Sequence, residues 1–428
     1  MLLFYIMLRT RELKNCKIAF VVPEFPSVSQ TFVVNQITDM IERGNEVRIF
    51  SFKRVEANPI HQVVERFKLM EKTTYFTYPP YSGAKRVWWF SYFAVMNFNT
   101  LIREPAFTFR KPASLRNGIR NLLLSRSFAA FYKTHAFDIV HVHFGQRGAT
   151  IANVIAKGLE RKFKFVVSFH GYDLNPHKIE RYRIAYKNLF HYADGVTVNS
   201  PYLKDILLKV CPHPKNLQLL PEGLRTDQFQ KQPLDSSPET SRFTILFCGR
   251  FVPFKAPDLA IHIMDVLVNR RRRSNVNLRM VGEGKLRNEV ERLINDFNLK
   301  EHVYLLGALS QEEVIKELSN ADLFLLPGIH EKETGRAETQ GLVIQEAQAM
   351  ELPVVVSDAG GMKYGLIDGV SGFVVKEGDV TGFAEKIELL INDEQLRASM
   401  AKAGRDFVVK TFDTKILGDK LSKIYDEI

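Results

Sequence analysis

Two kinds of hydrophobic pattern alternate along most of the chain. Short runs of apolar residues, closed by Gly, Pro or polar residues, are typical of strands buried on both faces of a sheet. Longer stretches repeat apolar residues every three or four positions and predict amphipathic helices. The predicted strands are 17–22, 46–52, 138–144, 164–169, 195–199, 217–220, 243–248, 276–281, 303–306, 323–326, 354–356 and 373–375.

These strands form two series separated by a polar segment, and strand alternating with helix indicates a parallel sheet. The pattern therefore predicts two doubly wound α/β domains. We expect the long basic stretch 53–133 to be mostly helical. The expected division is a lead-in at 1–15, an N-terminal domain at 16–230, a linker at 231–242, a C-terminal domain at 243–410 and a helix at 411–428 that could pack back on the N-terminal domain.

The stretch 338–357 holds two carboxylates, Glu338 and Glu346, eight residues apart. Apolar positions from Leu342 to Met350 recur at helical spacing, and Pro353 ends the helix. Eight helical residues rise about 12 Å, which is too far for the two carboxylates to share a proton or one metal ion. The separation suits two contacts along an extended ligand, although two exposed helix charges would explain the spacing equally simply.

Cationic residues follow the first strand of the second series. Gly249 allows a turn after the strand, and Arg250 and Lys255 come next, before a predicted helix. Two cations beside the free amides of a helix N-terminus can bind a diphosphate without a metal. Surface exposure of both cations is the weaker alternative, because the strand–turn–helix context fits the binding interpretation.

Histidines also lie at predicted strand ends. His170 and Gly171 follow strand 164–169, where a side chain can touch a ligand, although a structural hydrogen-bonded histidine is about equally consistent. His141 and His143 alternate on strand 138–144 and are expected to face the core or the floor between the domains. A metal site there is disfavoured because no acidic third ligand stands nearby.

Composition limits the classes of function. The chain has 428 residues, of which 45% are hydrophobic and 25% charged, values of a globular protein. Its three cysteines have no paired spacing, which argues against disulfides and zinc and fits a reducing compartment. The apolar start reaches only eight residues before Arg9, too short to span a membrane.

The net charge of +11 is uneven along the chain. Residues 85–133 contain nine Lys or Arg against one acid, Glu104, and both tryptophans, Trp88 and Trp89. Basic and aromatic residues on a helix suit an anionic membrane surface, which we favour over a buried helix with a solvated basic neighbour. No nucleic-acid-binding motif accompanies the charge, so we expect no nucleic-acid partner.

Several motifs stand in one order: Gly-Arg-Phe-Val-Pro-Phe-Lys (249–255), Val-Gly-Glu-Gly (281–284), Ala-Asp-Leu-Phe-Leu-Leu-Pro (321–327), Glu338-x7-Glu346-Ala, and Ser-Gly-Phe-Val-Val (371–375). Together they resemble glycosyltransferase family 4, the group 1 retaining enzymes of GT-B fold. Phe-Pro-Ser-Val-Ser-Gln-Thr-Phe (25–32) and His-Val-His-Phe-Gly (141–145) look like the bacterial exopolysaccharide subgroup, which includes colanic acid and amylovoran transferases.

The resemblance implies two Rossmann-like domains facing a deep cleft. It also implies sugar transfer from a UDP- or GDP-sugar to a lipid-linked oligosaccharide, at the cytoplasmic face of the membrane, in exopolysaccharide or lipopolysaccharide biosynthesis. Arg250 and Lys255 would neutralise the leaving diphosphate. Glu338 would contact the donor sugar, Glu346 the ribose, and His170 the sugar near its C6 side. Neither a metal nor a cofactor is implied.

The implied catalytic residues are His170, Arg250, Lys255 and Glu338. The implied donor-binding residues are Gly249, Arg250, Lys255, Glu338, Gln340, Gly341, Leu342 and Glu346. The acceptor side is expected at Ser29, Gln30, Thr31, His143 and Asp173.

The sequence departs from the family in places. Ser27–Thr31 stands where many members have a Gly-Gly loop, which leaves its amide contacts open, and Thr339 stands where Gly is common. A nucleotide-sugar 2-epimerase or hydrolase of the same fold is an alternative enzyme. A non-catalytic, membrane-associated nucleotide-sugar binding protein is an alternative of a different class.

Overall fold

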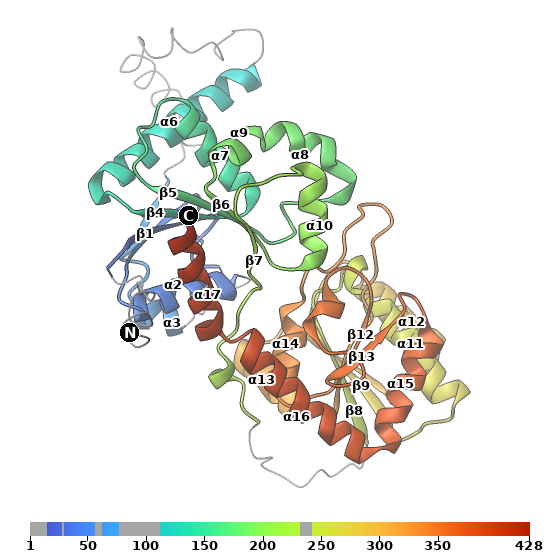
Figure 1. Ribbon diagram of the computed structural model, residues 1–428. Coiled ribbons are helices and arrows are strands. Elements are labelled where there is room, and N and C mark those ends of the chain that lie inside the picture. The colour runs from blue at the N-terminus through green and yellow to red at the C-terminus, as the bar shows by residue number, and fades with distance from the viewer. Residues whose placement is uncertain (1–14, 28–29, 56–61, 77–111, 232–241) are drawn as a thin grey trace, which may run out of the picture. The chain divides into compact units, whose positions relative to one another are not determined.

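The computed structural model describes residues 15–27, 30–55, 62–76, 112–231 and 242–428 (Figure 1). By their internal contacts the residues form two compact units. The first comprises Met1–Ser168, Ala185–Gly195 and Ile428, and the second comprises Phe169–Ile184 and Val196–Glu427. Residues 1–14 of the predicted lead-in, residues 232–241 of the predicted linker, Ser29, and both tryptophans of the 85–133 stretch lie outside the described residues.

Seven strands form the first sheet and six form the second. In the first sheet they are β1 (Lys17–Val22), β2 (Glu46–Ser51), β3 (Thr73–Tyr75), β4 (Ile139–His143), β5 (Lys164–Phe169), β6 (Gly195–Val198) and β7 (Leu217–Leu219). In the second sheet they are β8 (Phe243–Cys248), β9 (Val276–Val281), β10 (Val303–Gly307), β11 (Leu323–Leu326), β12 (Val354–Ser357) and β13 (Gly372–Val375).

Helices connect most of these strands. Those before residue 230 are α2 (Thr31–Glu42), α3 (Gln62–Arg66), α6 (Pro112–His135), α7 (Gly145–Ala156), α8 (Ile179–Ala185), α9 (Lys187–Tyr192) and α10 (Pro201–Val210). Those after it are α11 (Pro257–Asp265), α12 (Arg287–Asp296), α13 (Gln311–Ser319), α14 (Leu342–Ala349), α15 (Val380–Asn392), α16 (Glu394–Thr411) and α17 (Thr414–Glu427).

The strand order of both sheets is that of a doubly wound fold. The first sheet runs β3-β2-β1-β4-β5-β6-β7 and the second β10-β9-β8-β11-β12-β13. Neighbouring strands pair in parallel, for example β1 with β2 and β4, and β8 with β9 and β11. The order in which strands are added therefore reverses between β1 and β4 in the first sheet and between β8 and β11 in the second. Ligands of such sheets bind at these switch points, outside the carboxyl ends of the strands.

Burial explains why the strands were predictable. In β8, Ile245, Leu246 and Phe247 are 0% exposed, because a parallel sheet is covered on both faces. In the first unit, α2 and α3 lie on one face of the sheet and α6 and α7 on the other (Figure 1). In the second, α11 packs against α12 and α15, while α14 packs against α16.

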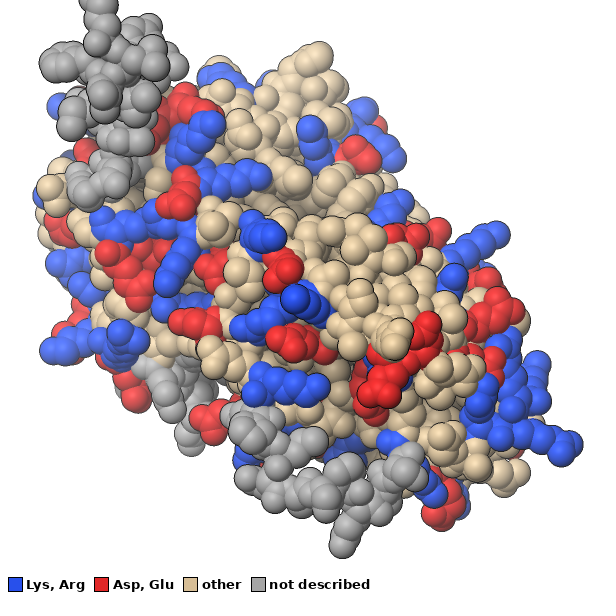
Figure 2. Space-filling model, turned by 60° about the horizontal axis from the view of Figure 1, so that its bottom comes forward, with Lys and Arg blue, Asp and Glu red and all other residues tan. Residues whose placement is uncertain are grey.

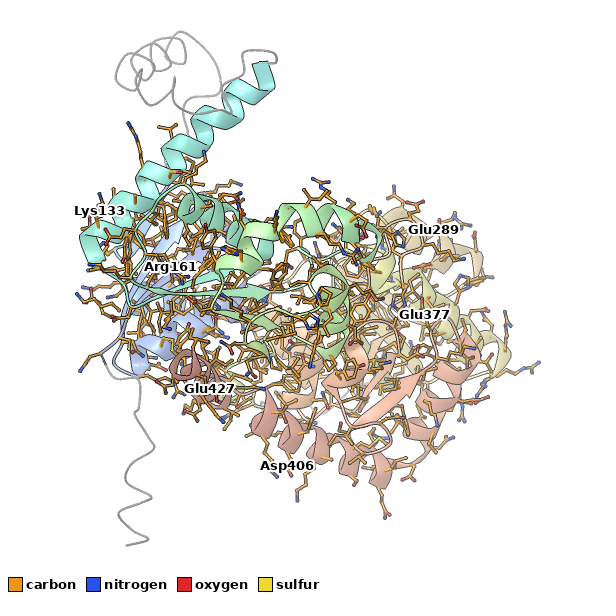
Figure 3. All side chains as sticks on the ribbon, turned by 45° about the horizontal axis from the view of Figure 1, so that its top comes forward. Lys133, Arg161, Glu289, Glu377, Asp406 and Glu427 are labelled. Carbon is orange, nitrogen blue, oxygen red and sulfur yellow. The ribbon has the colours of Figure 1, made fainter. Side chains whose placement is uncertain are left out.

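The two-domain α/β prediction is confirmed, and each predicted strand is present to within one residue at either end. The interpretation of 53–133 as mostly helical missed β3, a three-residue edge strand whose residues are only partly buried. Helix α6 does occupy the end of that stretch and carries Lys133 near its C-terminus (Figure 3). The final helical segment is two helices, α16 and α17, interrupted at Phe412 and Asp413.

Candidate functional site

The turn after β8 positions Lys255 at the switch point of the second sheet. Pro253–Lys255 forms a short 3-10 turn, and the Lys255 amide donates to the carbonyl of Val252 at 3.0 Å. Arg250 is exposed, whereas the Lys255 side chain is only 13% exposed. The two predicted phosphate cations thus differ: one is recessed in the second unit and the other reaches solvent.

Gly282 supports this turn by allowing two backbones to touch. A Cβ on Gly282 would lie 2.0 Å from the carbonyl oxygen of Gly249, so only glycine fits. The Phe251 amide also donates to the Glu283 carbonyl at 2.9 Å. The Gly-Glu-Gly motif, which resembles half of a dinucleotide fingerprint, therefore packs the loop after β9 on the loop after β8.

Glu338 lies on the loop between β11 and α14, and not on the helix. Helix α14 begins at Leu342, after Gly341 in the left-handed region (φ +79°). The Gly361 amide donates to the Glu338 carbonyl at 2.7 Å and fixes this loop from the β12 side. The helical rise assumed for Glu338 and Glu346 was therefore wrong, because only Glu346 occupies a helical position.

Lys255 and Glu338 form the central ion pair of the second unit. Their Nζ and Oε2 atoms are 2.6 Å apart, and the side chains are 13% and 16% exposed. Burial alone would raise the pKa of Glu338. The charge and hydrogen bond of Lys255, the Thr339 amide and the Arg250 charge outweigh burial and lower this pKa below its usual value. Glu338 is thus held as a carboxylate.

Glu346, on α14, is in the opposite electrostatic situation. Burial raises its pKa to about 7, although the Lys255 charge opposes the rise. The neighbouring Cys248 thiol has a pKa raised to about 12 by burial and by the Glu346 charge. At neutral pH the site therefore holds one carboxylate fixed in the ionised form and one that changes its charge near pH 7.

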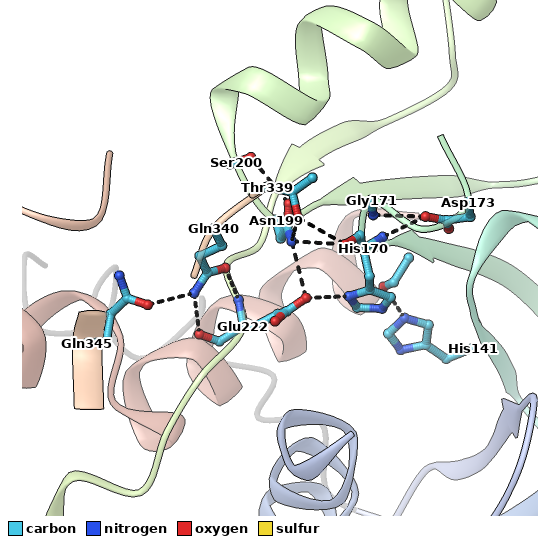
Figure 4. A network of polar contacts seen from close by, with 11 residues as sticks. His141, His170, Gly171, Asp173, Asn199, Ser200, Glu222, Thr339, Gln340 and Gln345 are labelled. Carbon is cyan, nitrogen blue, oxygen red and sulfur yellow. Dashed lines mark hydrogen bonds and ion pairs between the residues drawn. The ribbon is translucent and has the colours of Figure 1, made fainter. Parts of the chain in front are cut away.

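A second polar cluster surrounds His170, which follows β5 (Figure 4). The ring Nδ1 of His170 lies 3.1 Å from Oε1 of Glu222, and the same Oε1 accepts from Nδ2 of Asn199 at 3.1 Å. Asn199 follows β6 and Glu222 follows β7, so the three residues come from neighbouring strands of one sheet. All three belong to the second unit, together with Glu338.

Thr339 connects the Lys255–Glu338 pair to the polar cluster around His170. Its hydroxyl donates to the His170 carbonyl at 3.0 Å and accepts from Nδ2 of Asn199 at 3.2 Å. A Cβ on Gly171 (φ +105°) would lie 2.4 Å from the Thr339 methyl group. Threonine in place of the family's common glycine therefore connects the His170 turn to the Glu338 loop, and glycine at 171 leaves room for it.

The remaining predicted donor residues have partners in the same unit. Oε1 of Gln340 accepts from the Glu222 amide at 2.7 Å, and its Nε2 donates to the Glu222 carbonyl at 2.9 Å. Gly341 precedes α14 and Leu342 begins it, and the contact of their amides with a phosphate stays a prediction. Sequence reasoning missed Glu222 and Asn199. Asn199 is the last residue of one predicted strand and Glu222 lies close behind another, so both could have been found by position.

The predicted acceptor-side residues that the structure describes lie at a helix start, at the end of β4 and in the turn after β5. Gln30 is the residue before α2, and Thr31 begins that helix. His143 is 1% exposed, and its ring stacks on that of His141 at 4.7 Å. Asp173 is fully buried, and its Oδ1 accepts from the amides of His170 and Gly171 at 3.1 and 2.9 Å. Asp173 therefore shapes the His170 turn, and its contact with an acceptor stays a prediction.

Three further observations concern metal binding, membrane spans and surface charge. Among the described residues, no group of three or more His, Cys, Asp or Glu side chains could hold a metal ion. Nor is any helix in the described ranges long and apolar enough to cross a bilayer. On the face drawn in Figure 2, Lys and Arg side chains lie among Asp and Glu side chains.

Two family models match the chain and meet at residue 228. Residues 29–228 match the model described as Glycosyltransferase Family 4, and residues 228–407 match the model described as Glycosyl transferases group 1. Together the two matches include the Lys255–Glu338 pair and the His170 cluster.

Of three similar proteins, two are matched along their full length and the third over about two thirds of it. The amylovoran biosynthesis glycosyltransferase AmsK of Erwinia amylovora is 28% identical over 96% of this chain and 100% of its own. The putative colanic acid biosynthesis glycosyltransferase WcaL of Salmonella typhimurium is 26% identical over 96% and 100%. A GDP-mannose-dependent phosphatidylinositol monomannoside mannosyltransferase of Mycolicibacterium smegmatis is 27% identical over 61% of this chain and 69% of its own.

Solved structures share the fold. HepE of Anabaena in complex with UDP gives a TM-score of 0.71 at 17% identity, over 96% of this chain and 100% of that one. Sucrose-phosphate synthase of Thermosynechococcus elongatus gives 0.69 at 18% identity, over 96% and 99%.

Proposed function

The chain belongs to the family 4, group 1 glycosyltransferases of GT-B fold, and we propose that it transfers a sugar, with retention, from a UDP- or GDP-sugar to a lipid-linked saccharide. We assign this step to the assembly of an exopolysaccharide or related cell-surface polysaccharide. Its relatives named for amylovoran and colanic acid biosynthesis support that assignment. The observation that carries the proposal is the recessed Lys255–Glu338 pair at the β8/β11 switch point.

Lys255 and Arg250 are assigned to the diphosphate of the donor. An ammonium group has three N–H donors, so the bond from Lys255 to Glu338 leaves donors for phosphate oxygens. Negative charge grows on the diphosphate as the glycosidic bond breaks, and the two cations stabilise it without a metal. Charge-assisted hydrogen bonds contribute roughly 1.5–3 kcal/mol each, which corresponds to about a tenfold rate effect or more per cation.

The two glutamates and His170 are assigned to the rest of the donor. Glu338, held ionised by Lys255, is suited to accept hydrogen bonds from hydroxyls of the transferred sugar. Glu346 is assigned to the ribose hydroxyls, and the backbone amides of Gln340, Gly341 and Leu342 to the phosphate. His170 is assigned to the sugar near C6. Retention follows if the acceptor hydroxyl attacks from the face that the diphosphate leaves.

The acceptor and the membrane are the parts of the proposal that rest on sequence and relatives. Residues 85–133, with nine basic residues against one acid, suit an anionic bilayer surface, where a lipid-linked saccharide is presented. The mannosyltransferase named above acts on a phosphatidylinositol mannoside, which is a lipid-borne acceptor. We propose a peripheral location on the cytoplasmic face of the membrane.

The decisive experiment combines purified protein, a panel of UDP-, GDP- and ADP-sugars, and a bacterial lipid extract, with radiolabelled lipid product as the readout. HepE in complex with UDP and a GDP-mannose-dependent relative are the reasons to include both main nucleotides. Expected outcomes are transfer from one donor, unchanged by EDTA, and loss of transfer with Lys255→Ala. Free sugar without lipid product would indicate a hydrolase and an altered sugar an epimerase, while binding without turnover would indicate a binding protein.

Membrane association has its own test. The protein should float with anionic liposomes and less with neutral ones, and Trp88→Ala combined with Trp89→Ala should reduce flotation. Flotation that is absent on anionic liposomes, or that is unchanged in the double variant, contradicts this part of the proposal alone.

A further inference from the structure

The His170 ring is bonded to a carboxylate. Nδ1 of His170 lies 3.1 Å from Oε1 of Glu222, and the two side chains are only 10% and 13% exposed. A carboxylate accepts hydrogen bonds and does not donate them, so the contact requires the proton on Nδ1. In a neutral imidazole the other nitrogen, Nε2, is then an acceptor.

Glu222 is itself fixed by two side chains. Gln340 bonds both the amide and the carbonyl of Glu222, at 2.7 and 2.9 Å, and is 4% exposed. Nδ2 of Asn199 donates to Oε1 of Glu222 at 3.1 Å. The carboxylate is therefore held at backbone and side chain, in the arrangement drawn in Figure 4.

The backbone of His170 is fixed from the other side. Its carbonyl accepts from the Thr339 hydroxyl at 3.0 Å, and its amide donates to Oδ1 of Asp173 at 3.1 Å. With the backbone restrained by Thr339 and Asp173, the bond to Glu222 sets the rotation of the ring. The contacts of Thr339 also tie this arrangement to Glu338, the preceding residue.

We infer that Glu222 is a positioning residue of the transferase reaction, which orients the His170 ring and keeps its proton on Nδ1. Nε2 of His170 then acts as a hydrogen-bond acceptor for a hydroxyl of the donor sugar. A carboxylate that accepts a hydrogen bond from one ring nitrogen is a general way to orient an imidazole and fix its tautomer, while the other nitrogen contacts the ligand. The inference rests on the proposed function, because it assigns His170 to the donor sugar.

Steady-state kinetics test whether Glu222 acts through His170. Glu222→Gln keeps the size and an accepting oxygen but removes the charge, so we expect kcat to fall by about tenfold or more with KM changed by less than about threefold. In the His170→Ala background the same substitution should change kcat by less than about twofold, because its target is gone. Equal losses in both backgrounds would overturn the inference and indicate direct contact of Glu222 with substrate.

The tautomer can be observed without turnover. Nitrogen-15 NMR of histidine-labelled protein should show His170, assigned by loss of its signals in His170→Ala, as the Nδ1–H form. Gln can donate as well as accept, so Glu222→Gln should introduce Nε2–H tautomer or a mixture. An Nε2–H tautomer in the wild-type protein, or an unchanged spectrum in the variant, contradicts the inference.

Glu388→Gln is the matched control. Glu388 is similarly recessed, at 18% exposed, and bonds Arg271 and Arg273 away from the cluster. It should leave kcat and the His170 signals unchanged, and thermal unfolding should show that both variants are folded. If the wild-type protein transfers no sugar, the proposed function fails. If it does and Glu222→Gln has wild-type kcat, only the positioning role fails.

Discussion

Ionisation of Glu346 should make donor affinity depend on pH between 6 and 8. The pKa of this carboxyl is raised to about 7 by burial, against the opposing charge of Lys255. About one-tenth of the molecules would carry the ionised form at pH 6 and about nine-tenths at pH 8. Ribose hydroxyls donate hydrogen bonds most strongly to a carboxylate, so the donor should bind the ionised form preferentially.

The expected change follows from these populations. If only the ionised form binds well, the apparent Kd scales inversely with its population, and it should rise about tenfold from pH 8 to pH 6. Glu346→Gln should abolish this dependence and weaken binding at pH 8 by about tenfold or more, the loss of a charge-assisted hydrogen bond. Titration calorimetry with an intact nucleotide sugar is the assay, because its diphosphate does not change charge in this range.

Glu346→Gln should weaken donor binding but stabilise the unliganded protein against unfolding. The pKa of Glu346 is higher in the folded protein than in the unfolded chain, so the folded protein binds more protons between pH 4.5 and 7. The unfolding free energy therefore falls as pH rises through that window. A rise from 4.5 to about 7 corresponds to about 3 kcal/mol at pH 8, an upper limit for what Glu346→Gln could recover. The gain should be small at pH 4.5.

Two results would refute this reasoning. One is a Kd of the wild-type protein that is constant from pH 6 to 8. The other is an equal pH slope in Glu346→Gln, which would assign the titration to another group. Glu388→Gln serves as the control, because it removes a carboxylate bonded to Arg271 and Arg273 and should retain the wild-type slope.

Three further substitutions have distinct expected outcomes. Lys255→Ala should lower kcat by at least about tenfold and raise the pKa of Glu338, measured by kinetics and by carboxyl carbon-13 NMR; wild-type kcat would contradict it. Glu338→Ala should mainly slow turnover, with Kd for the nucleotide changed by less than about threefold in calorimetry, and a larger effect on Kd than on kcat would argue against its sugar contact. Gly171→Ala should lower the melting temperature, because its Cβ would lie 2.4 Å from the Thr339 methyl group, and Thr339→Gly should restore part of the loss in differential scanning calorimetry.

The strands were predictable because parallel sheets bury both faces of a strand. Runs such as Phe243–Cys248 and Leu323–Leu326 are apolar at nearly every position, so length and flanking residues sufficed to recognise them. The edge strand Thr73–Tyr75 has no such signal, because its pattern of burial is partial and its three residues are too few to show a period. Its pairing with β2 depends on neighbours far away in sequence.

The candidate site was predictable in residue type and only partly in geometry. Strand-end positions pointed to Lys255 and His170, since carboxyl ends of parallel strands share one edge. The spacing of Glu338 and Glu346 was misleading, because Gly341 ends the loop and only then does the helix begin. The bond between Glu222 and His170 could not be predicted from spacing, because the two residues are brought together by the sheet order.

Three carboxylates of one unit lie in different electrostatic environments because their neighbours differ. Glu338 is kept ionised by Lys255, Glu346 is kept near its midpoint by burial, and Glu222 is bonded to the His170 ring. Lys255 lowers the pKa of both Glu338 and Glu346, so a diphosphate that binds Lys255 would offset part of this effect and favour protonation of Glu346. The ribose hydroxyls would have the opposite influence on Glu346, since they stabilise its carboxylate. A complete nucleotide sugar should therefore leave Glu346 more ionised than inorganic diphosphate does, which separates the ribose contact from the phosphate contact at a single side chain.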